Sequence, residues 1–367
     1  MPNQLNVGIQ IRNLYKIFGP HAKSYVDAVK KGMPKAELLE KHGHVLGLKD
    51  INLDIPAGSI QVIMGLSGSG KSTLIRHINR LIDPTAGEVL IGGSDVMKMD
   101  QIKLREFRRS QTAMVFQKFA LLPHRDVLEN VIYGLEVRGF NKSKSIDVAM
   151  RWIERVGLKG FEKRYPTQLS GGMQQRVGLA RALSMDAPVL LMDEAYSALD
   201  PLIRMDMQSV LLDLQEEIKK TIVFITHDLD EALRLGDQIA ILRDGRMIQQ
   251  GTKQDIVMRP ADDYVESFVK QVNRAKIINV EGIMLPLRPN TSLVGPSLDA
   301  RLTIEEALRI VANAPDIDFV VLNSSGQAVG QINLKQLVFA LIESSAGCAV
   351  EAKTHPAIAT IQSIIRK

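Results

Sequence analysis

The sequence predicts an α/β fold with a largely parallel central sheet, followed by a smaller α+β unit. From residue 51 to about residue 226, apolar strand-like segments alternate with helical stretches, which is the pattern of repeated βαβ units. Residues 189–192 are apolar at every position, as expected for a strand covered on both faces. The composition changes after residue 273, and a length of 367 residues suits two domains.

The composition is that of a globular protein. Hydrophobic residues make up 45% of the chain and charged residues 24%, which is enough apolar material for a core. The net charge of +5 is a mild basic excess. It is compatible with an anionic membrane or a bound polyphosphate, but a solvated surface accounts for it, and it does not resemble a nucleic-acid-binding stripe. The single cysteine, Cys348, excludes an intrachain disulfide and a thiolate metal cluster.

We expect neither a signal peptide nor a membrane span. The first ten residues, MPNQLNVGIQ, lack an apolar core. The longest apolar runs, at residues 189–192, 222–225 and 319–322, are far shorter than the ~20 residues that cross a bilayer. If the chain serves a membrane, we expect it to do so as a peripheral subunit.

The N-terminal part predicts strands interrupted by a helical insert. Residues 7–18 alternate apolar and polar side chains and are interpreted as an edge strand. An insert at about residues 20–45 predicts two short amphipathic helices separated at Gly32-Met33-Pro34. Strand patterns resume at residues 51–55 and 59–64.

The C-terminal part predicts a helix-rich tail, a linker and a second unit. The tail covers residues 228 to about 273 and completes a first domain of residues 1–273. Residues 274–300 show little periodicity and are interpreted as a linker. Residues 301–367 then predict a helix (LTIEEALRIVANA), a strand (DFVVLN), a turn, a strand (QAVGQI), a helix (NLKQLVFALIES) and a tail.

A glycine-rich segment has the spacing of a P-loop, and it follows a strand and precedes a helix. Its glycines let backbone N–H groups curl around phosphates, and the helix N-terminus adds its positive end. The lysine can reach the β- and γ-phosphates and the serine hydroxyl can bind Mg²⁺. This spacing is improbable for a plain strand-to-helix turn. The predicted nucleotide-binding residues are Gly65, Leu66, Ser67, Gly68, Ser69, Gly70, Lys71, Ser72 and Thr73.

Two carboxylates end the apolar strand at residues 189–192. Asp193 stands at the strand's end, where a carboxylate suits Mg²⁺, usually through water. Glu194 is one residue on and points elsewhere, so it can polarise an attacking water as a general base. Alone, an apolar run with an acidic end is weak evidence for a catalytic site. With the P-loop upstream it is strong evidence.

A second helix begins with small residues. Ser170, Gly171 and Gly172 precede the helical pattern QQRVGLARAL, and such an N-terminus can hold an anion. One interpretation is a helix cap with a flexible turn. The other is a phosphate cradle for the nucleotide of a neighbouring subunit, since a P-loop enzyme does not need two cradles.

The order of these motifs closely resembles that of the ABC ATPase family over residues 7 to about 250. The elements are the P-loop, Gln117 after AMVF, LSGGM, LLMDE, Ser197-Ala198-Leu199-Asp200, and His227 after TIVFIT. The resemblance implies a helical subdomain at about residues 118–185, ATP and Mg²⁺ as ligands, and a homodimer that sandwiches two ATP molecules.

The resemblance also implies roles for single residues. Gln117 would contact Mg²⁺ and the lytic water, and Asp200 would lie at the dimer interface, where Ser170, Gly171 and Gly172 meet the partner's ATP. His227 would contact the γ-phosphate and hold Glu194 and the water in line. Phe18 matches the family's adenine-stacking aromatic, with Tyr15 as the alternative.

A narrower resemblance is carried by the insert KKGMPKAELLEKHG, by IMGLSGSGKSTLIRHINRLI and by SALDPLIR. These segments are similar to the ATPases of importers for glycine betaine, proline betaine, choline and related quaternary amines. The resemblance implies separate transmembrane permease subunits, an external solute-binding protein, and a peripheral place on the cytoplasmic face of the membrane.

The unit after residue 300 resembles one cystathionine-β-synthase (CBS) motif. The importer family often carries two in tandem, and residues 343–367 are too short for a second. This departure puts regulation by ionic strength or adenine nucleotides in doubt. With one motif per chain, the apolar strand at residues 319–322 suggests dimerisation, and the alternative is packing on the ATPase domain.

Two other classes fit less well. DNA-repair and chromosome ATPases of the ABC type carry long insertions between the P-loop and LSGGM, and this chain does not. ABC-type translation factors need two cassettes in one chain, and only one P-loop is present here. We therefore expect no nucleic-acid partner.

Overall fold

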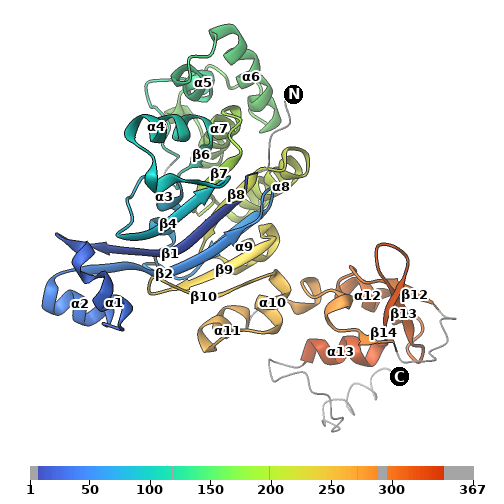
Figure 1. Ribbon diagram of the computed structural model, residues 1–367. Helices are drawn as coiled ribbons and strands as arrows, with labels where there is room; N and C mark the ends of the chain where they lie inside the picture. Colours follow the sequence, from blue (N-terminus) through green and yellow to red (C-terminus); the bar gives the residue numbers. More distant parts are fainter. Residues whose placement is uncertain (1–6, 118, 198, 271, 288–295, 343–367) are drawn as a thin grey trace. The chain divides into compact units, whose positions relative to one another are not determined.

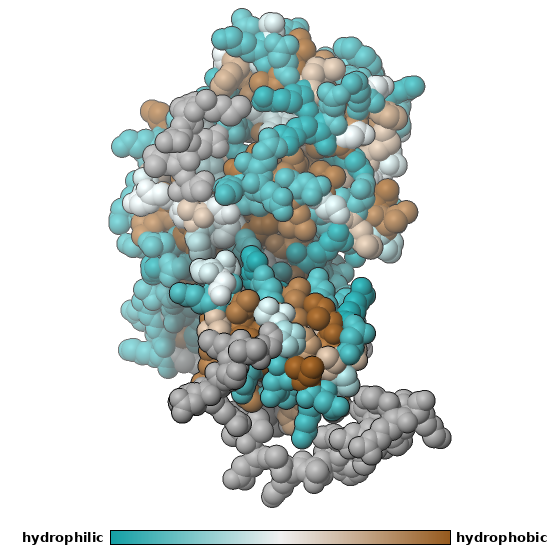
Figure 2. Space-filling model, turned by 90° about the vertical axis from the view of Figure 1, so that its right-hand side faces the viewer, coloured by the Kyte–Doolittle hydropathy of each residue, from teal (hydrophilic) through white to brown (hydrophobic). Residues whose placement is uncertain are grey.

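The chain is described by a computed structural model that covers residues 7–117, 119–197, 199–270, 272–287 and 296–342. It divides into two compact units, with the boundary between Asn273 and Arg274. No helix among the described residues has both the length and the apolar character needed to cross a membrane. The face in Figure 2 mixes hydrophilic and hydrophobic residues.

A six-stranded sheet forms the centre of the first unit (Figure 1). Its order is β10-β9-β3-β8-β7-β6; β10 pairs antiparallel with β9, and the remaining pairs are parallel. Every residue of β3, β7 and β8 is buried, as the apolar runs predict for strands covered on both faces. The bounds are β3 Ile60–Met64, β6 Thr112–Val115, β7 Val189–Asp193, β8 Thr221–Thr226, β9 Gln238–Arg243 and β10 Arg246–Gly251.

A second, antiparallel sheet has the order β2-β1-β4-β5. Strand β1 pairs with both β2 and β4, so the prediction of an edge strand at residues 7–18 is wrong. The alternating pattern reports that one face is buried and does not report the number of neighbouring strands. The bounds are β1 Ile9–Phe18, β2 Val45–Ile55, β4 Ala86–Ile91 and β5 Ser94–Asp95.

One hydrophobic core joins the two sheets. It contains residues of β1, β2 and β4 together with Ile63, Leu191 and Ile225 of the central sheet. Helix α3 (Lys71–Ile78) contributes Leu74, Ile75 and Ile78 to the same core. The start of α3 is thereby fixed against the strands that carry the candidate site. Helix α4 (Gln101–Ser110) and the short helix η2 (Val96–Lys98) lie between β5 and β6 in the chain.

The helical region between β6 and β7 contains three helices that pack on one another. They are α5 (Val127–Val137), α6 (Lys142–Arg155) and α7 (Gly171–Ser184), with the short helix η3 (Pro166–Gln168) before α7. The helical insert also forms, as η1 (Ala22–Tyr25), α1 (Val26–Lys30) and α2 (Lys35–His42). It has its own small core, which includes Tyr15, Val29 and Leu38.

The predicted helix-rich tail at residues 228 to about 273 does contain helices, but a β-hairpin that the sequence interpretation missed interrupts them. Helix α9 (Leu229–Leu235) is followed by the β9–β10 hairpin and only then by α10 (Lys253–Met258) and α11 (Asp263–Val269). Asp244 and Gly245 connect the strands with φ of 51° and 76°, which is the backbone that an Asp-Gly hairpin turn requires. That dipeptide was the sequence signal for the hairpin. Helix α8 (Pro201–Ile218) precedes β8.

The described part of the second unit is a mixed parallel and antiparallel sheet with the α-helices α12 and α13 and two short 3₁₀ helices. The sheet order is β11-β14-β13-β12, so the apolar strand β13 has a neighbour on each side, and the predicted helix, strand, strand and helix all form. Residues 343–367 lie outside the described residues. The elements are η4 (Arg274–Lys276), η5 (Val280–Gly282), β11 (Leu285–Pro286), β12 (Ser297–Asp299), α12 (Ile304–Val311), β13 (Phe319–Leu322), β14 (Ala328–Ile332) and α13 (Leu334–Ile342).

Candidate nucleotide site

The P-loop lies between the end of β3 and the start of α3. Gly65, Gly68 and Gly70 have φ of 149°, 79° and 103°, values that side chains other than glycine rarely adopt. At Gly65 a Cβ atom would also stand 2.2 Å from the carbonyl oxygen of Leu242. Backbone N–H groups can therefore turn inward at the N-terminus of α3, where an anion is favoured.

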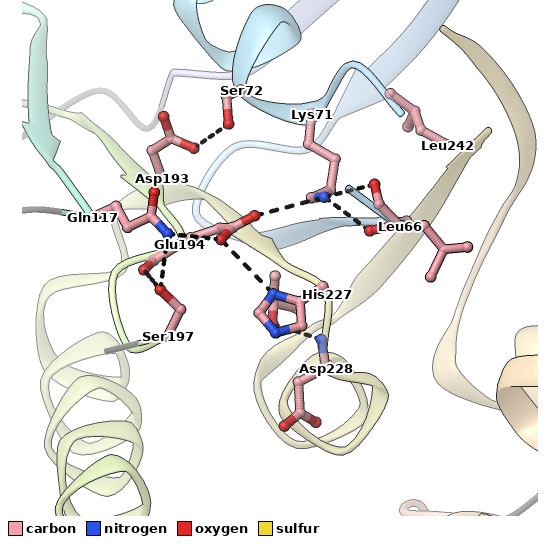
Figure 3. A network of polar contacts seen from close by, with 12 residues as sticks. Leu66, Lys71, Ser72, Gln117, Asp193, Glu194, Ser197, His227, Asp228 and Leu242 are labelled. Carbon is pink, nitrogen blue, oxygen red and sulfur yellow. Dashed lines mark hydrogen bonds and ion pairs between the residues drawn. The ribbon is translucent and has the colours of Figure 1, made fainter. Parts of the chain in front are cut away.

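Lys71 is buried at the centre of this loop, with 4% of its side chain exposed. Its Nζ donates hydrogen bonds to the carbonyl oxygens of Gly65 (2.8 Å) and Leu66 (3.1 Å). It also lies 3.6 Å from Oε1 of Glu194 (Figure 3). Burial lowers the pKa of Lys71, and the nearby carboxylate of Glu194 opposes that shift. Lys71 thus places a buried positive charge inside the P-loop, where a polyphosphate could bind.

Ser72 and Asp193 meet beside the lysine. The Ser72 hydroxyl donates to Oδ1 of Asp193 at 2.8 Å, and Arg76 approaches Oδ2 of the same carboxylate at 3.3 Å. Asp193 is buried, with 6% of its side chain exposed. A hydroxyl and a carboxylate in contact are oxygen ligands that suit Mg²⁺, which commonly completes its shell with substrate phosphates and water. Among the described residues there is no group of three His, Cys, Asp or Glu side chains that could hold a metal without such a substrate.

Glu194 is the meeting point of three elements. Its Oε2 accepts a hydrogen bond from Nε2 of Gln117 (3.1 Å) and lies 3.8 Å from Nδ1 of His227 (Figure 3). Gln117 follows β6 and His227 follows β8, the outer neighbours of β7 in the sheet. Glu194 itself has φ of 47°, a strained backbone for a residue with a side chain. The strained backbone and the polar neighbours Gln117, His227 and Lys71 give the Glu194 carboxylate a defined position at the carboxyl edge of the sheet.

Two further residues of this network were not among the predicted site residues. Ser197 donates to the carbonyl oxygen of Glu194 (2.9 Å) and accepts from Gln117 (3.3 Å). Arg204 of α8 reaches both the carbonyl oxygen of Leu199 (3.1 Å) and the carboxylate of Asp228 (3.2 Å). Arg204 thereby connects the loop before α8 to Asp228, the residue next to His227. No sequence pattern indicated this connection.

The segment at Ser170 lies outside this network. Ser170 is exposed and caps α7, its Oγ accepting from the N–H of Met173 at 3.3 Å. A Cβ on Gly172 would meet Ile203 of α8 at 2.6 Å, so the starts of α7 and α8 are close. Asp200 caps α8 by accepting from the N–H of Ile203 at 3.1 Å. Among the described residues, the hydrogen bonds of the Ser170 and Asp200 side chains are local and do not reach the P-loop.

The two aromatic alternatives differ in exposure. Tyr15 is 5% exposed and packs in the core of the helical insert, whereas Phe18 is 39% exposed. A Cβ on Gly47 would lie 2.7 Å from the Phe18 ring, so the glycine leaves this ring room at the surface. Of the two rings, Phe18 is the more accessible to a base, and the ammonium of Lys16 lies over it at 4.9 Å.

A P-loop, an acidic pair at the end of β7, and a histidine after β8 on one sheet edge define an ATP-hydrolysing cassette. The sequence profile of the ABC transporter family matches residues 48–197. The glycine betaine transport ATP-binding protein OpuAA of Bacillus subtilis (strain 168) is 52% identical over 278 residues, which are 76% of this chain and 66% of that protein. The glycine betaine/proline betaine transport system ATP-binding protein ProV of Escherichia coli (strain K12) is 44% identical over 95% of this chain and 88% of its own.

A solved structure agrees with the sequence relatives. A dimeric ATP-binding cassette in a post-hydrolysis state with ADP and Pi superposes with a TM-score of 0.57 and 33% identity, over 66% of this chain and 98% of that chain. This chain therefore belongs to the ATP-binding proteins of the ABC transporter family and is an ABC-type ATPase.

Proposed function

We propose that this chain hydrolyses ATP to drive the import of a small osmoprotective quaternary amine, such as glycine betaine, proline betaine or choline, through separate membrane subunits. The substrate class is supported by the transport functions in the names of OpuAA and ProV. The observation that carries the catalytic part is the position of Glu194, between Lys71, Gln117 and His227.

In this proposal each side chain acts on the nucleotide or the attacking water. Lys71 turns from the P-loop carbonyls to the β- and γ-phosphates, while Phe18 stacks on the adenine. Glu194 accepts the proton of the water, since it stands one residue beyond the Mg²⁺ carboxylate. His227 contacts the γ-phosphate and keeps Glu194 and the water in line.

We further propose that Mg²⁺ is held at Ser72, Asp193 and Gln117. When bound, this ion would neutralise charge that develops on the phosphates. The contact between the Ser72 hydroxyl and the Asp193 carboxylate supports the assignment, because both oxygens already converge there. Arg76, which pairs with Asp193, would neutralise the carboxylate when no metal is present.

The assembly in this proposal is a homodimer on the cytoplasmic face of the membrane. Each ATP would lie between the P-loop of one subunit and Ser170, Gly171, Gly172 and Asp200 of the other, so closure completes the site and hydrolysis reopens it. The permease subunits would receive that movement, and an external solute-binding protein would deliver the amine to them.

For the second unit we propose a single CBS-like motif that strengthens dimerisation. Its helix–strand–turn–strand–helix order supports the likeness, and Ile310 and Ile317 are exposed apolar residues. Removal of residues 275–367 should weaken association in sedimentation, with ATP in a Glu194→Gln background, and leave the melting temperature nearly unchanged. Unaltered association with a large loss of thermal stability would favour packing on the ATPase unit.

The transport function is tested in membranes. Vesicles that hold the chain with its co-purifying membrane subunits should take up labelled glycine betaine when ATP is supplied on the chain's side, and Glu194→Gln should abolish uptake. ATPase activity that responds to nucleic acid and ignores the membrane subunits would reject the transport function while leaving the ATPase intact.

A further inference from the structure

Helix α11 contacts the P-loop through one side chain. The hydroxyl of Tyr264 accepts a hydrogen bond from the backbone N–H of Leu66 at 3.3 Å and donates to the carbonyl oxygen of Leu242 at 3.3 Å. Leu66 is the second residue of the P-loop and Leu242 lies in β9. A phenolic hydroxyl can serve both groups at once because it is donor and acceptor.

The Tyr264 ring is held in place before any nucleotide binds. The guanidinium of Arg243 lies over the ring at 4.9 Å, and Phe268 meets it edge-on at 5.0 Å. Arg243 also pairs with Asp262 at 3.0 Å, and Asp262 caps α11. A hydroxyl on a ring packed in this way loses little freedom when it bonds the loop.

The P-loop is supported at a second point. The N–H of Gly245, in the β9–β10 turn, donates to the carbonyl oxygen of Ser69 at 3.0 Å. The β9–β10 turn therefore bonds the loop at Ser69, and Tyr264 bonds it near its beginning, at Leu66.

Lys71 makes the tyrosine contact important for binding. Lys71 now holds the carbonyl oxygens of Gly65 and Leu66, and these bonds weaken when its Nζ turns to phosphates. The Tyr264 hydroxyl bonds the Leu66 N–H and the Leu242 carbonyl oxygen, and neither bond involves Lys71, so it can keep the Leu66 peptide in place during that change. A loop that stays fixed without the lysine loses less entropy on binding.

We propose that Tyr264 is a positioning residue for the P-loop, which holds the Leu66 peptide in its nucleotide-binding conformation. This inference rests on nucleotide binding by the P-loop. It assigns a contribution to nucleotide affinity to α11, a helix that lies outside the motifs of the site.

The test is Tyr264→Phe in the full chain, which removes only the hydroxyl and keeps the packed ring. We expect the calorimetric Kd for Mg-ADP and the KM for ATP to rise about 3- to 10-fold, the size of one neutral hydrogen bond. The kcat at saturating ATP should not change, and the melting temperature should fall by no more than a few degrees. Tyr133→Phe is the matched control, because it removes the hydroxyl of another partly exposed tyrosine.

Arg243→Gln provides a second variant, since it keeps the hydroxyl and removes the cation that covers the ring. It should raise Kd in the same direction by a smaller factor. An unchanged Kd in Tyr264→Phe, or a loss in kcat together with a lowered melting temperature, would overturn the proposal. Lys71→Ala tests the P-loop itself, so tight binding there would reject nucleotide binding at this loop whatever Tyr264 does.

Discussion

The helix N-termini of α3 and α7, the two that we propose to hold phosphates, have different surroundings. The start of α3 is joined to charged groups of its own chain, through Lys71 to Glu194 and through Ser72 to Asp193. The start of α7 is exposed, and the Ser170 side chain bonds a backbone N–H of its own helix. In our proposal the first is the reaction centre of its own chain, and the second is half of a site whose other half belongs to another subunit.

The largest effect should come from the carboxylate at the reaction centre. Glu194→Gln keeps the hydrogen-bonding shape and removes the base, so steady-state ATP turnover should fall by about 10²- to 10⁴-fold. ATP should still bind, and closed dimers should accumulate in sedimentation with ATP.

Glu88→Gln is the matched control, because Glu88 is an exposed carboxylate of β4 with 50% of its side chain accessible. Near-normal turnover in Glu194→Gln would remove Glu194 from the role of base.

Lys71→Ala should act earlier, at nucleotide binding. It removes the buried cation that faces the phosphates, and loss of a charged hydrogen bond should weaken the affinity for ATP about 10- to 100-fold. Calorimetry measures this directly, with exposed Lys98→Ala as the control. An affinity equal to that of the unmodified chain would contradict the P-loop as the phosphate cradle.

The candidate site at α3 could be found from sequence because its side chains sit next to strand ends. The resemblance to the ABC ATPase family implied that Gln117, Glu194 and His227 act at one water. The structure brings the three side chains together from separate segments, because parallel strands present their carboxyl ends at one edge of the sheet. The contact of Tyr264 with Leu66 spans 198 residues of chain, and neither residue belongs to a pattern that would pair them.

In the fold, too, sequence patterns revealed some features and missed others. Periodicity identified the buried strands β7 and β8, whose apolar residues report burial on two faces. It could not count the neighbours of β1, because pairing depends on backbone groups that every residue carries. The hairpin at Asp244 and Gly245 was missed although the dipeptide is a turn signal, since helical patterns on both sides dominated the interpretation.

Helix α3, which begins at the P-loop, carries a buried histidine that makes stability depend on pH. His77 of α3 is fully buried, its Nδ1 lies 2.6 Å from the carbonyl oxygen of Thr73, and its Nε2 has no hydrogen-bond partner in the structure. Burial is the main cause that lowers the pKa of His77 from 6.5 to about 4. The unfolded chain therefore binds more protons between these values, and stability falls as the pH drops through that window.

The test compares the free energy of unfolding of the ATPase unit at pH 7.5 and pH 5.0 by urea denaturation. His77→Leu should make the loss on acidification smaller by about 2 kcal/mol. Exposed His42→Leu should leave the loss unchanged. If the His77 variant and the unmodified chain lost the same free energy of unfolding on acidification, His77 would not be kept neutral in the folded state.

The smallest expected effect is a twofold change in the number of ATP molecules that a dimer retains. It tests the comparison of the α3 and α7 N-termini directly. A Ser170→Arg chain keeps its P-loop, and a Lys71→Ala chain keeps its α7 start. Each homodimer then lacks one half of both sites. A mixed dimer of the two chains has one site with both halves intact and one with neither. If the two halves of a site come from different subunits, mixing two inactive proteins restores one site. If they come from one subunit, mixing restores nothing.

The measurement counts retained ATP. Both chains carry Glu194→Gln, so that bound ATP is retained and counted rather than consumed. By the two-fold symmetry of such a dimer, we expect about one ATP per mixed dimer against about two in the Glu194→Gln homodimer. Purification with a different tag on each chain isolates the mixed species, and radiolabelled ATP retained after gel filtration gives the count. Retention of no ATP by mixed dimers that do associate would mean that the start of α7 serves its own chain, and the two-subunit site would have to be abandoned.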